Sequence, residues 1–296
     1  MQATDSQILP ITTADGYHLN GTLFCAPQGH AAPVLVAGGL GISQRFYQAF
    51  AQWLALRGHT VLTFDLRGMG ASRPPGMGLR PVQADMLTWA QQDFAAAVQT
   101  LCTVTGAQQA TVIGHSLGAH HPAMTGPAAQ ARIHKLLSVA AGAGYWRDWA
   151  APSRNKAPLM LHLAGPLLTP IWGYFPGKRL GMVGDLPAGV MRQWRRWCRH
   201  PQFAWGAEPD KLRGVLHAAR YPIHALSFAD DEAMTLDCTR KLLAATPNAA
   251  STLEVIDPAS MGVQRIGHIG AFRKDMEQLL WPHMARCVAQ GKATGA

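Results

Sequence analysis

The sequence predicts an α/β protein: a mostly parallel, doubly wound sheet with an inserted, mainly helical cap. Short apolar, mostly β-branched runs alternate with longer segments of helical periodicity, as in strands that helices cover on both faces. The alternation is interrupted once, by a long segment rich in Trp, Pro and Arg at residues 144–221. We interpret that segment as the cap.

Eight strands are expected in the sheet. Two antiparallel strands open the chain on either side of Asp15 and Gly16, because an Asp-Gly pair favours the positive backbone angles of a hairpin turn. Further strands are predicted at residues 32–38, 59–65, 110–115, 136–142, 223–230 and 251–257. Helices are predicted at residues 44–57, 82–103, 117–130, 231–245 and 269–289.

This pattern divides the chain into a core of residues 1–143 and 222–290, a cap of residues 144–221, and a frayed tail at residues 291–296. The 296 residues are 48% hydrophobic and only 15% charged, so the chain can bury one large core. We find no internal repeat.

Charge and cysteine content narrow the functional classes. Lys and Arg number 26 against 17 Asp and Glu, but no basic tail, zinc-finger spacing or RNA-binding aromatic signature is present, so no nucleic-acid partner is expected. The five cysteines lack CxxC spacing, which favours a reducing compartment. Because no signal peptide or apolar run of about 20 residues is present, we expect a cytoplasmic protein.

The sequence GHSLG at residues 114–118 supplies a candidate nucleophile. It stands between an expected strand and an expected helix, where Gly114 and Gly118 leave room for a strained turn that exposes the Ser116 hydroxyl. The alternative, in which Ser116 only caps the helix, leaves both glycines unexplained.

A serine hydroxyl needs a general base, and the base needs an orienting acid. His268 lies in the loop after the last expected strand, and Asp230 and Asp231 end the strand that follows the cap. We favour Asp231 as the acid, with Asp230 as the alternative and Asp257 as a weaker third candidate. The chain order is then Ser, Asp, His.

A tetrahedral acyl-transfer intermediate also needs backbone N–H donors for its oxyanion. We expect one from Leu117, directly after the serine, and one from Leu40 in the glycine-rich turn after residues 32–38. That turn lacks the lysine and the spacing of phosphate-binding loops, so no nucleotide is expected.

No metal or other cofactor is expected. Three histidines gather near the candidate nucleophile, but they do not form a zinc-protease pattern: His115, His120 and His121. We expect His115 to pack beside the serine.

Residues 187–200 of the cap form an amphipathic helical pattern with Val190, Trp194 and Trp197 on one side and arginines on another. We favour a helix that packs its apolar side on the core. An arginine-lined mouth for acidic acyl substrates and docking on anionic lipid are weaker alternatives. A second apolar set lines a hydrophobic pocket or forms cap core: Leu161, Leu163, Leu167, Leu168, Ile171, Trp172, Tyr174 and Phe175.

Four stretches together resemble the α/β-hydrolase superfamily: FDLRGMGAS, GHSLG, FADDEA and IGHIGAFR. The chain is similar in particular to the bacterial predicted α/β-hydrolases grouped with serine aminopeptidase-like hydrolases, over nearly its whole length. The resemblance implies an α/β-hydrolase fold, with Ser116, Asp231 and His268 as the triad and Leu40 and Leu117 as oxyanion donors. One departure is AGGLG in place of the usual His-Gly, which weakens the assignment of Leu40.

The predicted function is a serine hydrolase that cleaves a carboxylic ester of a small to medium hydrophobic acyl group through an acyl enzyme. An amidase or aminopeptidase-like enzyme, or an acyltransferase, would use the same triad. The alternative from another class is a non-catalytic ligand-binding protein of the same fold. The expected partner is a small-molecule ester or amide, and the sequence leaves the oligomeric state open.

Overall fold

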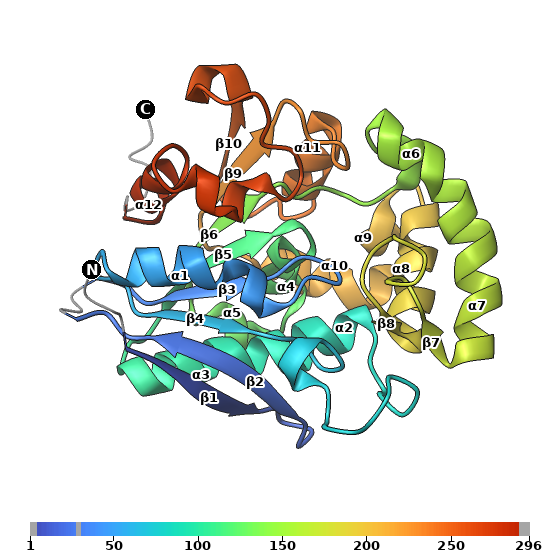
Figure 1. Ribbon diagram of the computed structural model, residues 1–296, viewed down its shortest axis with the longest axis horizontal. Coiled ribbons are helices and arrows are strands. Elements are labelled where there is room, and N and C mark those ends of the chain that lie inside the picture. Colours follow the sequence, from blue (N-terminus) through green and yellow to red (C-terminus); the bar gives the residue numbers. More distant parts are fainter. Residues whose placement is uncertain (1–4, 28–30, 290–296) are drawn as a thin grey trace.

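A computed structural model describes residues 5–27 and 31–289, and its centre is one eight-stranded sheet (Figure 1). The strands are β1 (Ser6–Thr12), β2 (His18–Phe24), β3 (Val34–Ala37), β4 (Val61–Phe64), β5 (Ala110–His115), β6 (Ile133–Val139), β9 (Ile223–Phe228) and β10 (Ser251–Ile256). The predicted frayed tail lies outside the described residues.

The spatial order of the strands is β1-β2-β4-β3-β5-β6-β9-β10. From β4 to β10 all neighbours are parallel, whereas β2 runs antiparallel to both β1 and β4. The opening hairpin turns at Gly16, where φ is +81°. The predicted fold class, a mostly parallel sheet with flanking helices, is confirmed.

Helices cover both faces of the sheet, and strand residues alternate between two cores. Leu35 and Val112 face the core that contains α3 (Ala95–Thr105). Val36 and Ile113 face the core that contains α1 (Gln48–Ala55) and α12 (Trp281–Ala289). Figure 1 shows α1 and α12 on one side of the sheet and α3 on the other. Because both faces are covered there, all residues of the central strands β3 and β4 are buried and most are apolar.

Several predicted boundaries are wrong. The helix expected at residues 117–130 is instead a 3-10 turn, η4 (Ser116–Ala119), followed by α4 (His121–Met124) and α5 (Pro127–Gln130). Pro127 cannot continue a preceding helix but is suited to a first turn. The strand expected at residues 136–142 ends at Val139, because Ala140 adopts a positive φ of 50°.

Two later helices begin well after their predicted starts. α11 (Leu236–Ala244) replaces the helix expected from residue 231, since residues 231–235 form the turn that carries Asp231. The helix expected from residue 269 starts at Trp281. Before it lie two short 3-10 turns, η8 (Gly270–Phe272) and η9 (Lys274–Met276).

The segment between β6 and β9 is mainly helical and lies at the right of Figure 1. It contains η5 (Trp146–Asp148), α6 (Ala151–Pro158), the π-helical η6 (Leu159–Ala164), α7 (Gly165–Trp172), α8 (Ala188–Arg199), α9 (Phe203–Ala207), α10 (Pro209–Ala218) and a small hairpin of β7 (Tyr174–Phe175) and β8 (Leu186–Pro187). The division into core and cap at residues 144 and 221 stays a prediction.

The predicted amphipathic helix in this segment is α8. Its apolar side chains Val190, Trp194 and Trp197 are buried, which agrees with the favoured interpretation of a helix packed on the core. The second apolar set of the cap contains both buried and exposed side chains. Leu161 and Phe175 are buried, whereas Leu163, Leu167 and Ile171 face solvent, so these last three are not cap core. Within the described residues no helix is long and apolar enough to cross a membrane.

Arg67, directly after β4, ties the opening hairpin to the helical layer. Its Nε donates to Asp93 over 2.7 Å, and its Nη1 donates to Asp15 over 2.6 Å. Asp93, in the π-helical η3 (Trp89–Phe94), is fully buried, and burial raises the pKa of its carboxyl to about 6 although the Arg67 charge lowers it. The two ion pairs of Arg67 support the turn formed by residues 65–72.

Replacing Arg67 with alanine leaves the Asp93 carboxyl buried without its cation. We expect a loss of about 3 to 5 kcal/mol in the free energy of unfolding, measured by urea denaturation. Arg240→Ala is the matched control, because its ion pair with Asp237 is exposed and contributes less than about 1 kcal/mol. Equal effects of the two substitutions would contradict the structural role of Arg67.

Two consecutive histidines lie buried behind η4. The Nε2 atom of His120 bonds to the Gly142 carbonyl, whereas neither ring nitrogen of His121 has a hydrogen-bond partner among the described residues. Burial lowers the pKa of His120 to about 4, and burial together with the nearby His120 lowers the pKa of His121 to about 3. Both rings are therefore neutral near pH 7.

Acid should destabilise the protein through these rings. Between the ordinary histidine pKa of about 6.5 and the lowered values, the unfolded chain binds more protons than the folded one, so stability falls as the pH drops, by up to about 1.4 kcal/mol per pH unit for each ring. Urea unfolding at pH 7 and pH 5 measures the loss. His121→Phe should reduce this pH dependence, and an unchanged dependence in that variant would contradict the assignment.

Candidate active site

Ser116 lies on a sharp turn where β5 ends and η4 begins. Its φ is 51°, a left-handed conformation that costs a non-glycine residue about 1 to 3 kcal/mol. Both neighbouring glycines are needed for space. A Cβ on Gly118 would lie 2.0 Å from the Ala37 carbonyl oxygen, and one on Gly114 would lie 2.5 Å from the Ala119 Cα. The turn therefore places the Ser116 hydroxyl beyond the carboxyl end of the strand.

His268 and Asp231 reach this hydroxyl from later in the chain. The Ser116 hydroxyl lies 2.9 Å from His268 Nε2, and His268 Nδ1 lies 3.0 Å from Asp231 Oδ2. The Asp231 side chain is only 2% exposed, and that of His268 is 16% exposed. With Nδ1–H donating to the carboxylate, Nε2 is left as the acceptor that faces the serine. The structure thus brings the three predicted residues together.

Asp231, the favoured acid, is the carboxylate that contacts the imidazole. Its Oδ1 also accepts the N–H groups of Ala233 and Met234 over 2.7 and 2.8 Å, which fixes the side chain in the turn after β9. Asp230 turns the other way and accepts the N–H groups of Ile266 and Gly267 over 2.9 and 3.0 Å. The two adjacent carboxylates thus hold opposite sides of the histidine loop.

Glu232 completes this acidic group. Its Oε2 accepts the backbone N–H of His268 over 3.0 Å, and its other oxygen pairs with Arg265. Burial raises the pKa of the Glu232 carboxyl, but the bond from His268 and the charge of Arg265 outweigh it, so the net pKa is lowered. Three successive acidic residues therefore contact the loop at residues 265–268.

Asp257, the weaker third candidate for the acid, has a local role. Its side chain accepts the N–H of Ala259 and begins the short 3-10 turn η7 (Pro258–Met261). This accords with the expectation that Asp257 shapes the loop leading to His268.

The predicted oxyanion donors lie on either side of the serine. Leu117 is the second residue of η4, where the first N–H groups of a helix have no partner inside the helix. On the other side, Gly39 lies so close that a Cβ on it would be 3.4 Å from the Ser116 Cβ. The N–H of Gly39 donates to the Tyr47 hydroxyl over 2.9 Å and is therefore occupied. The N–H of Leu40, next along the turn, stays the predicted second donor.

Tyr47 and His115 connect this turn to the histidine loop. The Tyr47 hydroxyl accepts from Gly39 and donates to His115 Nδ1 over 2.7 Å. His115 Nε2–H then donates to the backbone carbonyl of His268 over 2.9 Å. Burial, and to a smaller extent the charge of His268, lowers the pKa of His115 to about 3, so the ring stays neutral and each nitrogen keeps its role.

Sequence patterns did not identify Tyr47 or Glu232, and they placed His115 beside the serine without a partner. Tyr47 lies directly before α1 in a segment that looks like ordinary core, and no spacing relates it to His115, which is 68 residues away. The one available signal was the run of three acidic residues at 230–232. The sequence alone does not relate this run to the backbone of the histidine loop.

The cap segment adjoins the same loops. The Ser153 hydroxyl donates to the Glu232 carbonyl over 2.7 Å, and the Ala150 N–H donates to Ala233. A Cβ on Gly41 would lie 2.5 Å from the Gly184 nitrogen, so the turn after β3 packs directly against the cap. His115, His120 and His121 form no metal-binding group in the part of the chain described.

This geometry can perform acyl transfer. A hydroxyl that is bonded to an imidazole, which is in turn bonded to a buried carboxylate, is arranged for deprotonation of the hydroxyl as it attacks a carbonyl. The N–H groups of Leu117 and Leu40 stay the predicted donors to a negative oxygen.

Comparison with known proteins agrees with the fold. Three solved structures resemble the chain. A soluble variant of monoglyceride lipase from Saccharomyces cerevisiae is 15% identical, with a TM-score of 0.66, 100% of this chain covered and 97% of that one. An esterase of Pyrococcus furiosus is 14% identical, with a TM-score of 0.60, 96% of this chain covered and 90% of that one. The 2-hydroxy-6-oxo-6-phenylhexa-2,4-dienoate hydrolase of a Rhodococcus species is 16% identical, with a TM-score of 0.56, 96% of this chain covered and 98% of that one.

No curated protein matches the sequence significantly. A sequence model of the alpha/beta hydrolase family, however, matches residues 34–269, which include the serine turn, the Asp231 turn and His268. The chain belongs to the alpha/beta hydrolase family.

Proposed function

We propose that this protein is a serine hydrolase that cleaves carboxylic esters through an acyl-enzyme intermediate. The observation that carries the proposal is the continuous hydrogen-bonded series from Asp231 through His268 to Ser116. The esterase and lipase among the similar folds support ester substrates over amides. The membership in a hydrolase family supports catalysis over ligand binding alone.

In the first half of the reaction, Ser116 Oγ attacks the ester carbonyl while His268 Nε2 takes the hydroxyl proton. The carbonyl oxygen becomes negative and accepts hydrogen bonds from the N–H groups of Leu117 and Leu40. Collapse of this intermediate breaks the bond to the alcohol, which leaves with the proton that His268 returns. Asp231 keeps the imidazole oriented and stabilises its positive charge.

In the second half, water replaces the alcohol. His268 takes a proton from the water as it attacks the acyl carbonyl, and then returns that proton to Ser116 Oγ as the carboxylic acid leaves. An alcohol or amine in place of water would give acyl transfer with the same residues. A panel of p-nitrophenyl esters and aminoacyl amides compared by kcat/KM distinguishes these outcomes, and we expect the highest values for esters with small to medium hydrophobic acyl groups.

Ser116→Ala should reduce ester hydrolysis by at least about 1000-fold, because the covalent step is lost and only the oxyanion donors and binding remain. A fluorophosphonate probe, read by intact mass, should label the wild type once and leave Ser116→Ala unlabelled. Ser251→Ala, which alters an exposed serine at the amino end of β10, is the matched control. Equal ester turnover by Ser116→Ala and wild type would refute the nucleophile.

We expect the adjacent carboxylates of Asp230 and Asp231 to have different roles. Asp231→Asn should lower kcat by about 1000-fold or more, because the amide no longer favours the Nδ1–H tautomer of His268. Asp230→Asn should mainly lower the melting temperature, since it weakens the bonds to Ile266 and Gly267. A larger loss of kcat in Asp230→Asn than in Asp231→Asn would reverse the assignment.

Tyr47→Phe removes the hydroxyl that joins Gly39 to His115. We expect kcat to fall about 10- to 100-fold with little change in KM, because the oxyanion turn and the histidine loop lose their shared support, as for other groups that orient a site. Phe46→Leu, next in the chain but outside this network, is the control. Unchanged kcat in Tyr47→Phe would show that the network serves folding alone.

A further inference from the structure

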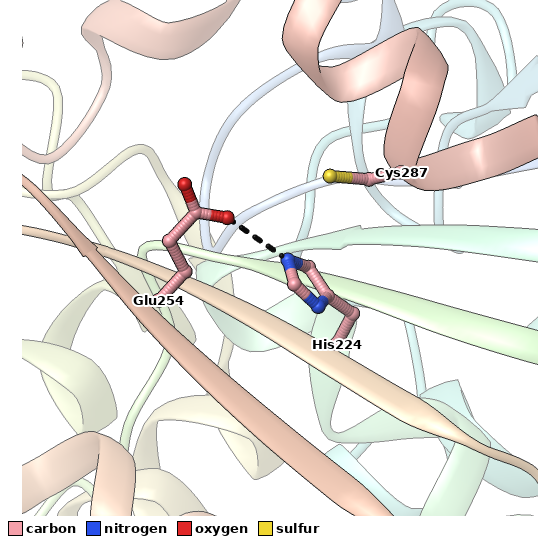
Figure 2. A group of neighbouring side chains, drawn as sticks. All are labelled: His224, Glu254 and Cys287. Atoms are coloured by element: carbon pink, nitrogen blue, oxygen red, sulfur yellow. Dashed lines mark hydrogen bonds and ion pairs between the residues drawn. The ribbon is translucent and has the colours of Figure 1, made fainter. Parts of the chain in front are cut away.

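A second cluster of ligand-type side chains lies far along the sheet from Ser116. Figure 2 shows the Glu254 carboxylate directed at the His224 ring, with the Cys287 thiol extending from a helix above the strands toward the same space. One donor atom from each of these residues lies within 4.8 Å of the others. A fourth side chain, His283, adjoins them: its Nε2 is 3.0 Å from Glu254 Oε2 and 3.7 Å from Cys287 Sγ.

The fold brings these four side chains together from three elements. His224 is near the start of β9, and Glu254 lies on the neighbouring parallel strand β10 opposite Leu226. Residues 224 and 226 face the same side of the sheet, so His224 and Glu254 are diagonal neighbours. His283 and Cys287 are four residues apart on α12 and so share one helix face. That helix packs on this side of the sheet.

The measured separations suit a tetrahedral zinc site. With Zn–N and Zn–O bonds of about 2.0–2.1 Å and Zn–S of about 2.3 Å, donor atoms of a tetrahedron lie about 3.3–3.6 Å apart. The three separations are 3.2 Å between His224 Nε2 and Glu254 Oε2, 3.0 Å from Glu254 to His283, and 3.7 Å from His283 to Cys287. His224, Glu254 and Cys287 already have donor atoms within 4.8 Å of one another, whereas His283 lies outside that compact group and its side chain must move toward His224 to bind the same ion.

One ligand is already supported from behind. His224 Nδ1 lies 2.7 Å from the Thr252 hydroxyl, the residue opposite it on β10. With Nδ1–H donating to Thr252, Nε2 is free of its proton and directed into the cluster. Such an outer hydrogen bond orients most metal-binding histidines.

The charges around the cluster also need to balance. Glu254 and a Cys287 thiolate would together neutralise a divalent ion. Arg286 is exposed and its Nη2 lies 3.4 Å from His283 Nδ1, so it can turn toward solvent when a metal binds. The Cys287 side chain is buried, and its thiol is not part of a disulfide.

We propose that His224, Glu254, His283 and Cys287 form a structural Zn²⁺ site that fastens α12 to the edge strands β9 and β10. Two imidazoles, one carboxylate and one thiolate are ligands that favour zinc in tetrahedral geometry. Binding displaces the thiol proton of Cys287, which is released to solvent as the Zn–S bond forms. The site is independent of the ester chemistry proposed above, because it lies near the amino end of β9 whereas Asp231 follows its carboxyl end.

The test measures metal binding on the full-length, chelator-treated protein. Isothermal titration with Zn²⁺ should give one ion per chain, and the same protein loaded with Co²⁺ should show the absorption of tetrahedral cobalt with a thiolate charge-transfer band. Zn²⁺ should also raise the melting temperature and protect Cys287 from alkylation.

Variants assign the binding to these residues. Cys287→Ser should abolish the charge-transfer band, and both Cys287→Ser and Glu254→Gln should weaken Zn²⁺ binding at least tenfold. Cys25→Ser and Glu277→Gln, which alter a cysteine and a glutamate outside the cluster, should leave binding unchanged. Circular dichroism checks that each variant is folded. Absence of stoichiometric binding, or equal affinity in Glu254→Gln and wild type, would mean that the cluster is an ion-pair network only.

An independent observation concerns the outer face of the cap segment. The run α6–η6–α7 carries four apolar side chains at intervals of four residues, which we call the leucine stripe: Leu159, Leu163, Leu167 and Ile171. They are between 51% and 67% exposed. Such a contiguous exposed apolar row marks an interaction surface.

The segment of sequence that contains the leucine stripe carries positive charge. No Asp or Glu occurs between Asp148 and Asp185, whereas exposed basic residues flank the stripe in the sequence: Arg154, Lys156, Lys178 and Arg179. An apolar helix face with basic neighbours and no acidic ones is complementary to an anionic lipid surface.

We infer that the leucine stripe docks on anionic bilayers. Co-sedimentation should show binding to vesicles of phosphatidylglycerol and phosphatidylcholine, at least tenfold weaker binding to pure phosphatidylcholine, and a further loss at high salt. Leu163→Glu with Ile171→Glu should abolish binding, whereas Val104→Glu, an exposed apolar residue on α3, should not. Vesicle binding that the double variant retains would overturn the proposal, as would a dimer in light scattering that the double variant disrupts without any lipid binding.

Discussion

The close approach of η4 to the end of β3 is the constraint on which the site depends. The Gly118 Cα lies so near the Ala37 carbonyl that no side chain fits between them, and this contact holds the chain in the turn that forces Ser116 to a φ of 51°. A buried parallel sheet can impose such strain because its strands are covered on both faces and cannot relax outward. The Ser116 hydroxyl, the Leu117 N–H and the neighbouring Gly39 turn all take their positions from it.

The second requirement is that His268, on a loop more than 150 residues later, meets this fixed hydroxyl. No regular helix or strand carries it. Backbone bonds hold the loop instead: Asp230 binds the N–H groups before it, Glu232 binds its own N–H, and His115 binds its carbonyl. Because His115 also bonds to Tyr47, and Tyr47 to Gly39, the His268 loop and the Gly39 turn are positioned by one buried network. Preorganisation of this kind lowers the reorganisation cost at the reacting centre.

Sequence patterns predicted the parts of this arrangement that depend on local chemistry. Apolar runs marked the strands, the Asp-Gly pair marked the hairpin, and the glycines around Ser116 marked the turn, because each of these features is set by a few adjacent residues. The structure also places Asp231, and not Asp230, against the imidazole. The helix starts at residues 236 and 281 were not predicted. The turns before these two helices contain hydrogen-bonded carboxylates or 3-10 geometry, but their apolar residues keep a spacing that looks helical in the sequence. Tyr47, Glu232 and the cluster around Glu254 were missed because they are joined only by tertiary contacts between distant segments.

The most direct measurement is a crystal structure of the protein after reaction with an alkyl fluorophosphonate. The account predicts phosphorus bound to Ser116 Oγ, with the phosphoryl oxygen about 2.7–3.1 Å from the N–H groups of Leu117 and Leu40 and the imidazole of His268 still bonded to Asp231. A phosphonate bound to another residue, or a phosphoryl oxygen directed away from both N–H groups, would contradict it.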